Sequence, residues 1–465
     1  MIAPRDLPHS CVAGRSDASQ ALSTSPFYGV AQACSAGRLG VLQLIHRCVE
    51  LAHKALLRTP FPDAPGVDVR PALCWYLERR LQDLLLGLRA AQTLRVTSRP
   101  SPELCRLVTL TCENWVTEIN EFSRRLAGDA ERIGQRFGDA RPPRLLAVTP
   151  GLSDPHYCGR TVHLLKFEGF SLVYKPRAVT IEVQFQRFVR WFGQLLGEEF
   201  RVIDMLESED YSWCEYIPFE PFNSMDDAQR FFARAGILLF VCYLLGVTDC
   251  HTENTNTTRD GPVLVDAETV LHPDFVPKLL PWRQPADTVL RPGLVHSLRP
   301  LALEFSATAF MVRGFRQAYE AVLHDPRLRD AVRDRMAGFS GGRSRVVFRA
   351  TSFYHETLFR SLSPGALSSR TERHLVLQAI AQPFTHPDAR RAFGPLIEAE
   401  VVSLENLDVP CFFADAMGTK VTDGHSLVAA DVLERGGLPA ALDRLDSLNH
   451  TELERMRSIL QATLM

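Results

Sequence analysis

The residues from Asp249 to Asn254, Asp-Cys-His-Thr-Glu-Asn, place a carboxylate, a histidine and an amide within six positions. Asp266 follows twelve residues after Asn254, at the end of the short apolar run Val-Leu-Val. Phosphoryl transfer needs a carboxylate beside the attacking hydroxyl and oxygen ligands that hold Mg²⁺ against the phosphates. Asp249 meets the first requirement, and Asn254 with Asp266 meets the second. In protein kinases the catalytic Asp also precedes the metal-binding Asn by five positions.

A fixed cation for the nucleotide phosphates should lie upstream, on a strand. Lys175 closes the β-like run Ser-Leu-Val-Tyr-Lys and is the candidate, and Glu182 on the following segment could steady its ammonium. Neither a Walker A loop nor a Gly-x-Gly-x-x-Gly loop occurs in the sequence, which argues against an ordinary protein kinase. Taken alone, Lys175 would more often be a solvated lysine at a strand end. Asp249 and Asn254 could likewise be helix caps or polar turns.

The segments around these residues predict an α+β unit, because β-like and helical patterns alternate. The apolar run before Asp249 is long enough for a buried helix that ends near Gly246. The expected order is an antiparallel hairpin over 161–175 with its turn at Glu168-Gly169, a helix over 181–197, a short strand within 211–217, the long apolar helix, a polar loop, and a strand within 262–268.

Four segments are expected along the 465-residue chain. The first is rich in Ser, Pro, Gly and Ala and lacks periodicity, the second repeats apolar residues at helical spacing, and the third carries the β-like runs. The fourth is mostly helical and is interrupted by a β-like run over 343–351. They predict a flexible arm (1–36), a helical N-terminal layer (37–145), a kinase-like core (146–290) and a mostly helical C-terminal region (291–465).

Composition excludes several classes of function. The chain is 46% apolar and 23% charged, as is usual for soluble globular proteins, and its formal net charge of -2 gives no general case for nucleic acid as a partner. The longest apolar stretch, Ala235–Val247, is shorter than the roughly 20 residues that span a bilayer. The first residues contain no signal-peptide run, and the eleven cysteines show no zinc-site spacing. We therefore expect a cytoplasmic protein without membrane insertion.

These motifs resemble, in the same order, those of the dehydratase portion of LanM-type (class II) lanthipeptide synthetases. The matching segments are 153–177, 211–217, 246–256, 262–269, 344–354 and 407–412. The resemblance implies a lipid-kinase-like, two-lobed catalytic core, with a helical N-terminal layer and helical C-terminal additions. It also implies that ATP and Mg²⁺ are used to phosphorylate Ser and Thr of a leader-bearing precursor peptide. Elimination of phosphate then gives dehydroalanine and dehydrobutyrine.

The resemblance assigns roles in phosphorylation to five residues. Lys175 would bind an ATP phosphate, and Asp249 would serve the attacking hydroxyl. Asn254 and Asp266 would hold Mg²⁺. His251 would support the phosphates or the loop. Glu268 falls within a matching motif, and the resemblance gives it no definite role.

The family's elimination residues correspond to Asp154 and His156, and to Arg345 and Thr351 in the β-like run. A base must remove the α-proton beside a peptide carbonyl, and hydrogen-bonding or cationic groups must stabilise the enolate and the departing phosphate. His156 is the candidate proton carrier, and Arg345 is the candidate phosphate clamp. Without the resemblance, His156 would be interpreted as an ordinary loop histidine.

The sequence departs from the family at Ser153, where the family usually has Gly, and at 407–412, where Leu-Asp-Val-Pro-Cys-Phe replaces a Gly-Asp-Ile-Pro-Tyr-Phe-like motif. It also stops at Met465, where the family would continue into a zinc-dependent cyclase. The leading hypothesis is a stand-alone peptide dehydratase, with a separate cyclase, or none, acting later.

Two alternatives remain open. One is a kinase that stops at the phosphorylated product, on a peptide or a small molecule; the retained elimination residues argue against it. The other is a catalytically silent protein that binds the precursor peptide and presents it to a partner. The complete set of Lys175, Asp249, Asn254 and Asp266 argues against that alternative.

Overall fold

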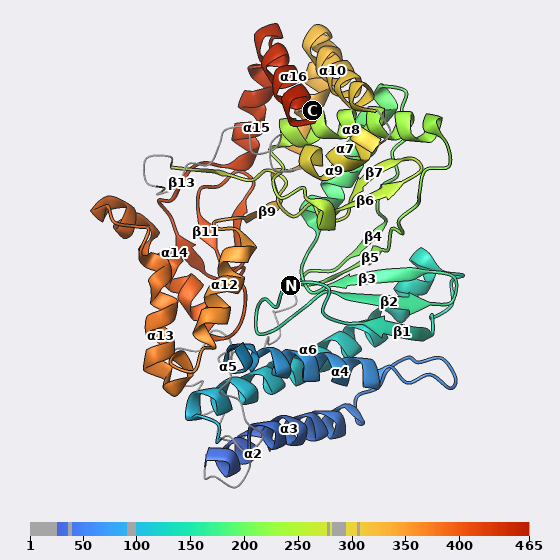
Figure 1. Cartoon of the computed structure of the whole chain (residues 1–465). Coiled ribbons are helices and arrows are strands. Elements are labelled where there is room, and N and C mark those ends of the chain that lie inside the picture. The colour runs from blue at the N-terminus through green and yellow to red at the C-terminus, as the bar shows by residue number, and fades with distance from the viewer. Residues whose placement is uncertain are drawn as a thin grey trace, which may run out of the picture. The chain divides into compact units, whose positions relative to one another are not determined.

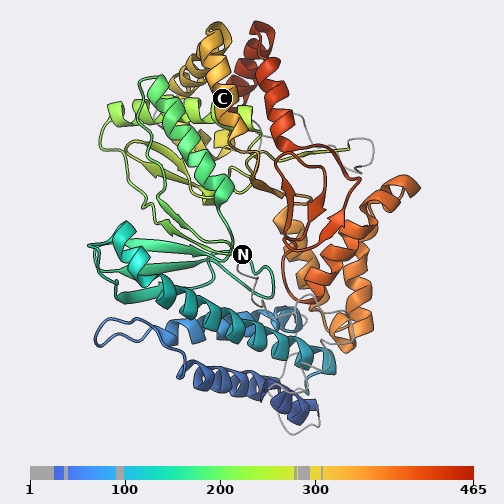
Figure 2. The same cartoon turned by 180° about the vertical axis from the view of Figure 1, so that it is seen from behind.

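The computed structural model describes residues 26–35, 40–90, 99–276, 280, 294–304 and 307–464 (Figures 1 and 2). Residues 1–25, most of the predicted arm, lie outside this part of the chain. The described residues mix helices with small antiparallel sheets, so the α+β class is confirmed. They form two compact units. Unit 1 comprises the chain up to Pro176 with Arg349–Pro383 and Ile397–Pro410, and unit 2 comprises Arg177–Phe348, Phe384–Leu396 and Cys411–Met465.

Unit 1 begins with a helical layer, drawn from blue to teal in Figure 1. Its longest helix, α6, starts at an N-cap serine: Ser101 accepts a hydrogen bond from the Leu104 amide at 3.2 Å, and a proline occupies the first turn. Helices α2, α3 and α4 pack against α6. The bounds are α2 Pro26–Ser35, α3 Val41–Leu56, α4 Arg70–Asp83, α5 Leu86–Ala90 and α6 Pro102–Phe137.

The strands of unit 1 follow α6. β2 (His163–Phe167) pairs with both β1 (Leu145–Thr149) and β3 (Ser171–Lys175) in antiparallel register. The turn between β2 and β3 contains Gly169 with φ of 85°, a conformation that favours glycine. The predicted hairpin is therefore confirmed, and Lys175 is the last residue of β3.

Unit 1 is completed by helices from the second half of the chain: α12 (Thr351–Ser361), α13 (Arg370–Gln378), the short turns η3 (Ala366–Ser368) and η4 (Ala379–Ala381), and the part of α14 (Pro387–Glu405) beyond Ile397. Glu400 in α14 is fully buried and accepts hydrogen bonds from Arg349 at 2.7 Å and from the Tyr354 hydroxyl at 2.6 Å. This charge-assisted network fixes the first turn of α12 on α14.

Unit 2 holds most of the remaining elements. Its strands pair as β4 with β5, β6 with β7 and β13 with β8, and as a four-stranded sheet in the order β12-β11-β10-β9. The helices are α7 Thr180–Leu195, α8 Met225–Leu245, η2 Thr252–Asn254, α9 Leu294–Glu304, α10 Thr308–His324, α11 Pro326–Ala337, α15 Gly437–Asp446 and α16 His450–Leu464. The strands are β4 Met205–Glu207, β5 Ser212–Glu215, β6 Thr255–Thr258, β7 Gly261–Leu264, β8 Asp274–Phe275, β9 Arg343–Val346, β10 Phe412–Asp415, β11 Val421–Thr422, β12 Leu427–Ala429 and β13 Leu433–Arg435.

The central helix of unit 2 is α8, which matches the predicted apolar helix. Ser224 caps its start by accepting from the Asp227 amide at 3.1 Å, and Gly246 ends it with φ of 60°. Among the described helices, α8 is long and apolar enough to cross a membrane, but 83% of its apolar window is buried inside the protein. The burial agrees with the prediction of a core helix.

Helices α8 and α10 approach each other through two glycines. A Cβ atom at Gly236 would overlap the carbonyl oxygen of Met311, and one at Gly314 would overlap the carbonyl oxygen of Ala233. The backbones therefore meet where each helix lacks a side chain. This contact fixes α8, whose end carries the predicted catalytic loop, within the core of unit 2.

One sequence prediction is wrong: Arg345 and Thr351 do not share a strand. β9 ends at Val346, and Thr351 is the first residue of α12. The buried Val346 and Phe348 alternate with less buried neighbours, which produces the β-like pattern. Beyond β9 the Val347 amide donates to the His272 imidazole at 3.0 Å instead of continuing a ladder, and the chain then turns into the helix.

Candidate functional site

The loop after α8 folds back on itself and joins three predicted residues. The Asn254 side-chain amide donates to the Asp249 carbonyl at 2.8 Å, and His251 Nε2 lies 3.5 Å from Asp249 Oδ1. Asp249 has φ of 60°, a left-handed conformation that Asp adopts more readily than most residues. The loop therefore brings together three residues that were predicted to act in the same reaction.

Asp266 reaches the same loop through the β6–β7 hairpin. Thr255 pairs with Leu264, so Asn254 and Asp266 flank the same end of the hairpin. The Val265 amide also donates to the Asn254 carbonyl at 2.8 Å. The two predicted metal ligands are therefore carried by neighbouring strand ends.

Arg177 is a residue of this site that the sequence analysis missed. Its guanidinium lies 2.8 Å from Glu182 Oε2, 2.8 Å from Asp266 Oδ1 and 3.1 Å from Glu268 Oε2. Burial alone would lower the pKa of Arg177, but these carboxylates outweigh it and raise the pKa, so the guanidinium stays charged. One feature of the sequence could have indicated this residue: it is a second basic residue, two positions after Lys175, in a segment that resembles the family.

Glu268 links Arg177 to Arg345. Its carboxylate forms an ion pair with the Arg345 guanidinium, and its carbonyl accepts from the Arg345 amide at 2.8 Å. Burial would raise the pKa of Glu268, but the two guanidiniums hold it below the usual value for a glutamate. Arg345, expected to serve elimination, is thus joined through ion pairs to Asp266, expected to serve phosphorylation.

The charges of this cluster act on Asp249. Burial raises the pKa of its carboxyl; His251 and Arg345 oppose the shift, and the neighbouring carboxylates of Glu268 and Asp266 add to it. The net result is a raised pKa, which makes Asp249 a stronger proton acceptor than an exposed aspartate.

Lys175 lies in unit 1, at the end of β3. Only 4% of the residue is exposed, which differs from an ordinary solvated lysine at a strand end. Glu182, the suggested partner for this lysine, is fully buried in α7 of unit 2, pairs with Arg177 and accepts from the Ala267 amide at 3.3 Å.

Asp154 and His156 belong to a tightly braced loop in unit 1. His156 Nδ1 lies 2.6 Å from the Val409 carbonyl oxygen, and the Val409 amide donates to the Pro155 carbonyl at 2.8 Å. Tyr157, Cys158 and Gly159 follow with φ values of 46°, 66° and 81°. Three successive left-handed residues are unfavourable unless the surroundings enforce them.

The carboxylate of Asp408 enforces this turn. Its two oxygens accept from the Cys158 amide at 2.7 Å and the Gly159 amide at 2.9 Å. Burial raises the pKa of Asp408 to about 6, although the two amides oppose the shift. The segment 407–412, recognised in the sequence as a family motif, therefore braces the loop that carries Asp154 and His156.

Thr351 begins α12, and His355 lies one turn further along the helix. His355 Nε2 is 2.8 Å from Asp154 Oδ1. Unit 1 thus gathers Asp154 and His355 beside the turn that starts with Thr351, with His156 on the same loop as Asp154. His355 was not predicted; its position four residues after Thr351 was the signal that could have indicated it.

The residues predicted to hold Mg²⁺ suit that ion chemically. Asp266 offers a carboxylate, and Asn254 uses its amide nitrogen as a donor, which leaves the amide oxygen as its possible ligand atom. Mg²⁺ prefers oxygen and is commonly held by one or two protein side chains together with water and substrate phosphates. Two ligands at neighbouring strand ends are compatible with that mode of binding.

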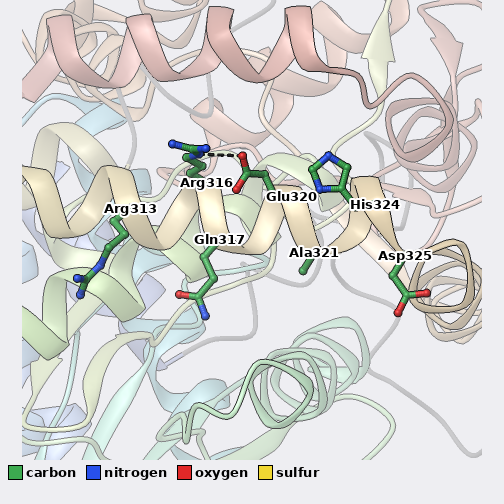
Figure 3. A pocket seen from close by; sticks show the side chains of 7 residues that line it. All are labelled: Arg313, Arg316, Gln317, Glu320, Ala321, His324 and Asp325. Carbon is green, nitrogen blue, oxygen red and sulfur yellow. Dashed lines mark hydrogen bonds and ion pairs between the residues drawn. The ribbon is translucent and has the colours of Figure 1, made fainter.

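A surface hollow of about 580 Å³ lies along one face of α10 in unit 2 (Figure 3). Arg316 and Glu320 form an ion pair on it at 2.8 Å. The residues that line it are Arg313, Arg316, Gln317, Glu320, Ala321, His324 and Asp325. None belongs to the predicted set, so this hollow is not assigned to the chemistry described above.

Comparison with known proteins gives two results. A 128-residue stretch is 30% identical to the "Lacticin 481/lactococcin biosynthesis protein LcnDR2" of Lactococcus lactis subsp. lactis, covering 25% of this chain and 14% of that protein. The family described as "Domain of unknown function (DUF4135)" matches residues 102–309 and 305–415. These ranges include both the loop at 249–254 and the braced loop at 153–160. Because they cover more than half of the sequence, the chain belongs to this DUF4135 family.

Proposed function

We propose that this protein is a peptide Ser/Thr dehydratase of lanthipeptide biosynthesis. It phosphorylates hydroxyl groups of a leader-bearing precursor peptide with ATP and Mg²⁺, and then eliminates phosphate. The observation that carries the proposal is the connected cluster in unit 2, where Asp249, Asn254 and Asp266 occur together with Arg345. The first three residues serve phosphorylation, and Arg345 adds a guanidinium that can hold the departing phosphate during elimination.

In the proposed phosphorylation, Asp249 accepts the proton of the attacking Ser or Thr hydroxyl. Its raised pKa favours that role, and His251 restrains its carboxylate. Asp266 and Asn254 would hold Mg²⁺, which neutralises charge on the transferring phosphoryl group. Lys175 is the proposed cation for a nucleotide phosphate.

In the proposed elimination, Arg345 stabilises the departing phosphate. Its planar guanidinium offers five N–H donors, and the ion pair with Glu268 leaves others for a phosphate. Asp154, His156 and Thr351 are the proposed groups for proton movement and for hydrogen bonding to the enolate. Loss of the α-proton and of phosphate leaves the dehydrated residue.

The biosynthetic setting rests on the similarity to the lacticin 481/lactococcin biosynthesis protein and on the order of the motifs. That similarity covers 14% of the relative's length. The precursor peptide and any partner protein are therefore part of this proposal and are not taken over from the relative. A cyclase is a proposed partner of this protein. We also propose a lipid-kinase-like arrangement of the catalytic core and a cytoplasmic location.

The test is mass spectrometry of a candidate precursor peptide incubated with enzyme, ATP and Mg²⁺. Dehydration lowers the mass by about 18 Da per site, and phosphorylation alone raises it by about 80 Da. Asp266→Asn should abolish both products while circular dichroism stays unchanged, since it removes a charge needed at the proposed metal. Modification by this variant at the wild-type rate would contradict the assignment of Asp266. Phosphorylation without mass loss in the wild type would favour the kinase that stops at the phosphorylated product.

A further inference from the structure

Asp154 and His355 form a carboxylate–imidazole pair between two elements of unit 1. Asp154 Oδ1 lies 2.8 Å from His355 Nε2, although 201 residues separate them in sequence. An ionised carboxylate only accepts hydrogen bonds, so the ring donates its proton at Nε2. That tautomer leaves Nδ1 with a lone pair and makes it the basic nitrogen.

The imidazole also shares a helix face with Thr351. The two residues are four positions apart at the start of α12, and such residues lie one above the other on a helix. The His355 side chain is 55% exposed and the Asp154 side chain 30% exposed. A peptide can therefore reach the imidazole while the carboxylate behind it is partly covered.

Both sides of the pair are anchored. The loop of Asp154 is held by Asp408 and by the hydrogen bonds of Val409, and the first turn of α12 is held by the buried Glu400. Anchoring of this kind fixes the angle between a base and the group that orients it before substrate arrives. An incidental surface pair between two flexible side chains would lack that support.

We propose that His355, oriented by Asp154, is the general base of the elimination step. This inference rests on the proposed dehydratase function and adds a residue that neither the sequence motifs nor the family match assigns. His355 Nδ1 takes the α-proton of the phosphorylated Ser or Thr. The C–H electron pair first forms the enolate and then the Cα=Cβ bond as the Cβ–O bond breaks, and phosphate departs with the bonding pair and takes a proton from solvent.

Substitution at this position should leave the fold intact, because exposed ion pairs contribute little to stability. His355→Ala is therefore a clean test. His46→Ala is the matched control: His46 is a second histidine of unit 1, on α3, and pairs with a carboxylate, that of Glu50, at 3.3 Å.

The experiment gives each full-length variant a prephosphorylated peptide in ADP and Mg²⁺, and separately an unmodified peptide in ATP and Mg²⁺. His355→Ala should slow elimination on the order of a hundredfold or more and accumulate phosphopeptide, while phosphorylation stays within about threefold of wild type. Added imidazole should restore part of the elimination rate in this variant. His46→Ala should match the wild type with and without imidazole.

Elimination by His355→Ala at the wild-type rate would overturn the inference, and so would loss of both steps together. The inference would also be overturned if imidazole did not rescue elimination by His355→Ala while the His355→Gln protein eliminated at the wild-type rate. In that case the side chain at 355 would only position Asp154. If the wild-type protein itself neither phosphorylates nor dehydrates peptide, the proposed function fails and the experiment reports that separately.

Discussion

Arg177 and Glu268 hold the predicted site residues in place. They contact the predicted residues Asp266 and Arg345, and neither was selected from the sequence as catalytic. Three carboxylates surround one guanidinium, and Glu268 is shared between two guanidiniums. Such a network fixes the orientation of Asp266 and Arg345 without contributing atoms to the reaction.

Arg177→Met should destabilise the protein by about 3–5 kcal/mol, because it leaves partly buried carboxylates without their common cation. Arg177→Lys should cost less, since it keeps the charge and loses only the forked geometry. Urea unfolding measures both. The control is Arg187→Met, at an exposed position of α7, which should change stability by less than about 0.5 kcal/mol. An Arg177→Met protein as stable as this control would show that the network does not hold the site.

Among the elements, the loop over 153–160 is the most constrained by its surroundings. Tyr157, Cys158 and Gly159 take left-handed conformations, and the Asp408 carboxylate accepts from two of their amides. The same carboxylate is buried, which raises its pKa to about 6. Its ionisation is thus coupled to the conformation of the loop that carries Asp154.

Asp408 should give the free energy of unfolding a distinct pH dependence. Because its pKa in the fold exceeds the ordinary value of 3.8, the folded state binds the proton more tightly than the unfolded state between about pH 4 and 6. Its contribution to stability is therefore greatest below pH 4 and falls as pH rises through 6. Two pKa units correspond to about 3 kcal/mol.

The measurement is urea unfolding of wild type and Asp408→Asn at pH 4.5 and pH 7. The stability of wild type relative to the variant should fall by about 2–3 kcal/mol over that range. Asp139→Asn, at an exposed position of unit 1, reports the effect of removing surface charge. If the free energy of unfolding of wild type minus that of Asp408→Asn stayed constant or rose with pH, burial would not be the main influence on the pKa of Asp408.

At the scale of the whole molecule, the packing of α8 against α10 determines where the catalytic loop begins. Gly314→Ala should destabilise the protein by at least about 1–3 kcal/mol, because the new methyl group would overlap the Ala233 carbonyl and push the helices apart. Gly128→Ala is the matched control: this α6 glycine has open space around its Cβ position, so alanine should stabilise by about 0.5–1 kcal/mol. Thermal unfolding compares the two. Equal effects of the two substitutions would show that the helix crossing tolerates a side chain.

Much of the local structure could be predicted from the sequence. The hairpin with its turn at Glu168-Gly169, the helix α7, and the apolar helix ending at Gly246 follow from apolar periodicity and glycine placement, and all are present. The β-like pattern over 343–351 was misleading, since burial alternates at Val346 and Phe348 although the segment leaves the strand and enters a helix.

The contacts of the candidate site could be anticipated only where residues are close in sequence. Asp249, His251 and Asn254 lie within one loop, so their spacing indicated their proximity. Arg177 meets Glu268, and Asp154 meets His355, through tertiary packing that no local pattern encodes. A cation that pairs with three carboxylates looks like any other arginine until the fold brings them together.

The glycine contact between α8 and α10 has a consequence for genetics. A screen for inactive variants would recover substitutions at Gly236 and Gly314 alongside those at Asp249, although neither glycine has a side chain that could take part in chemistry. Such variants would lower the amount of folded protein, whereas Asp249 variants would keep the protein abundant and silent. Measuring abundance and specific activity together would separate the two groups and divide the essential positions of α8 and its loop into those that build the site and those that react.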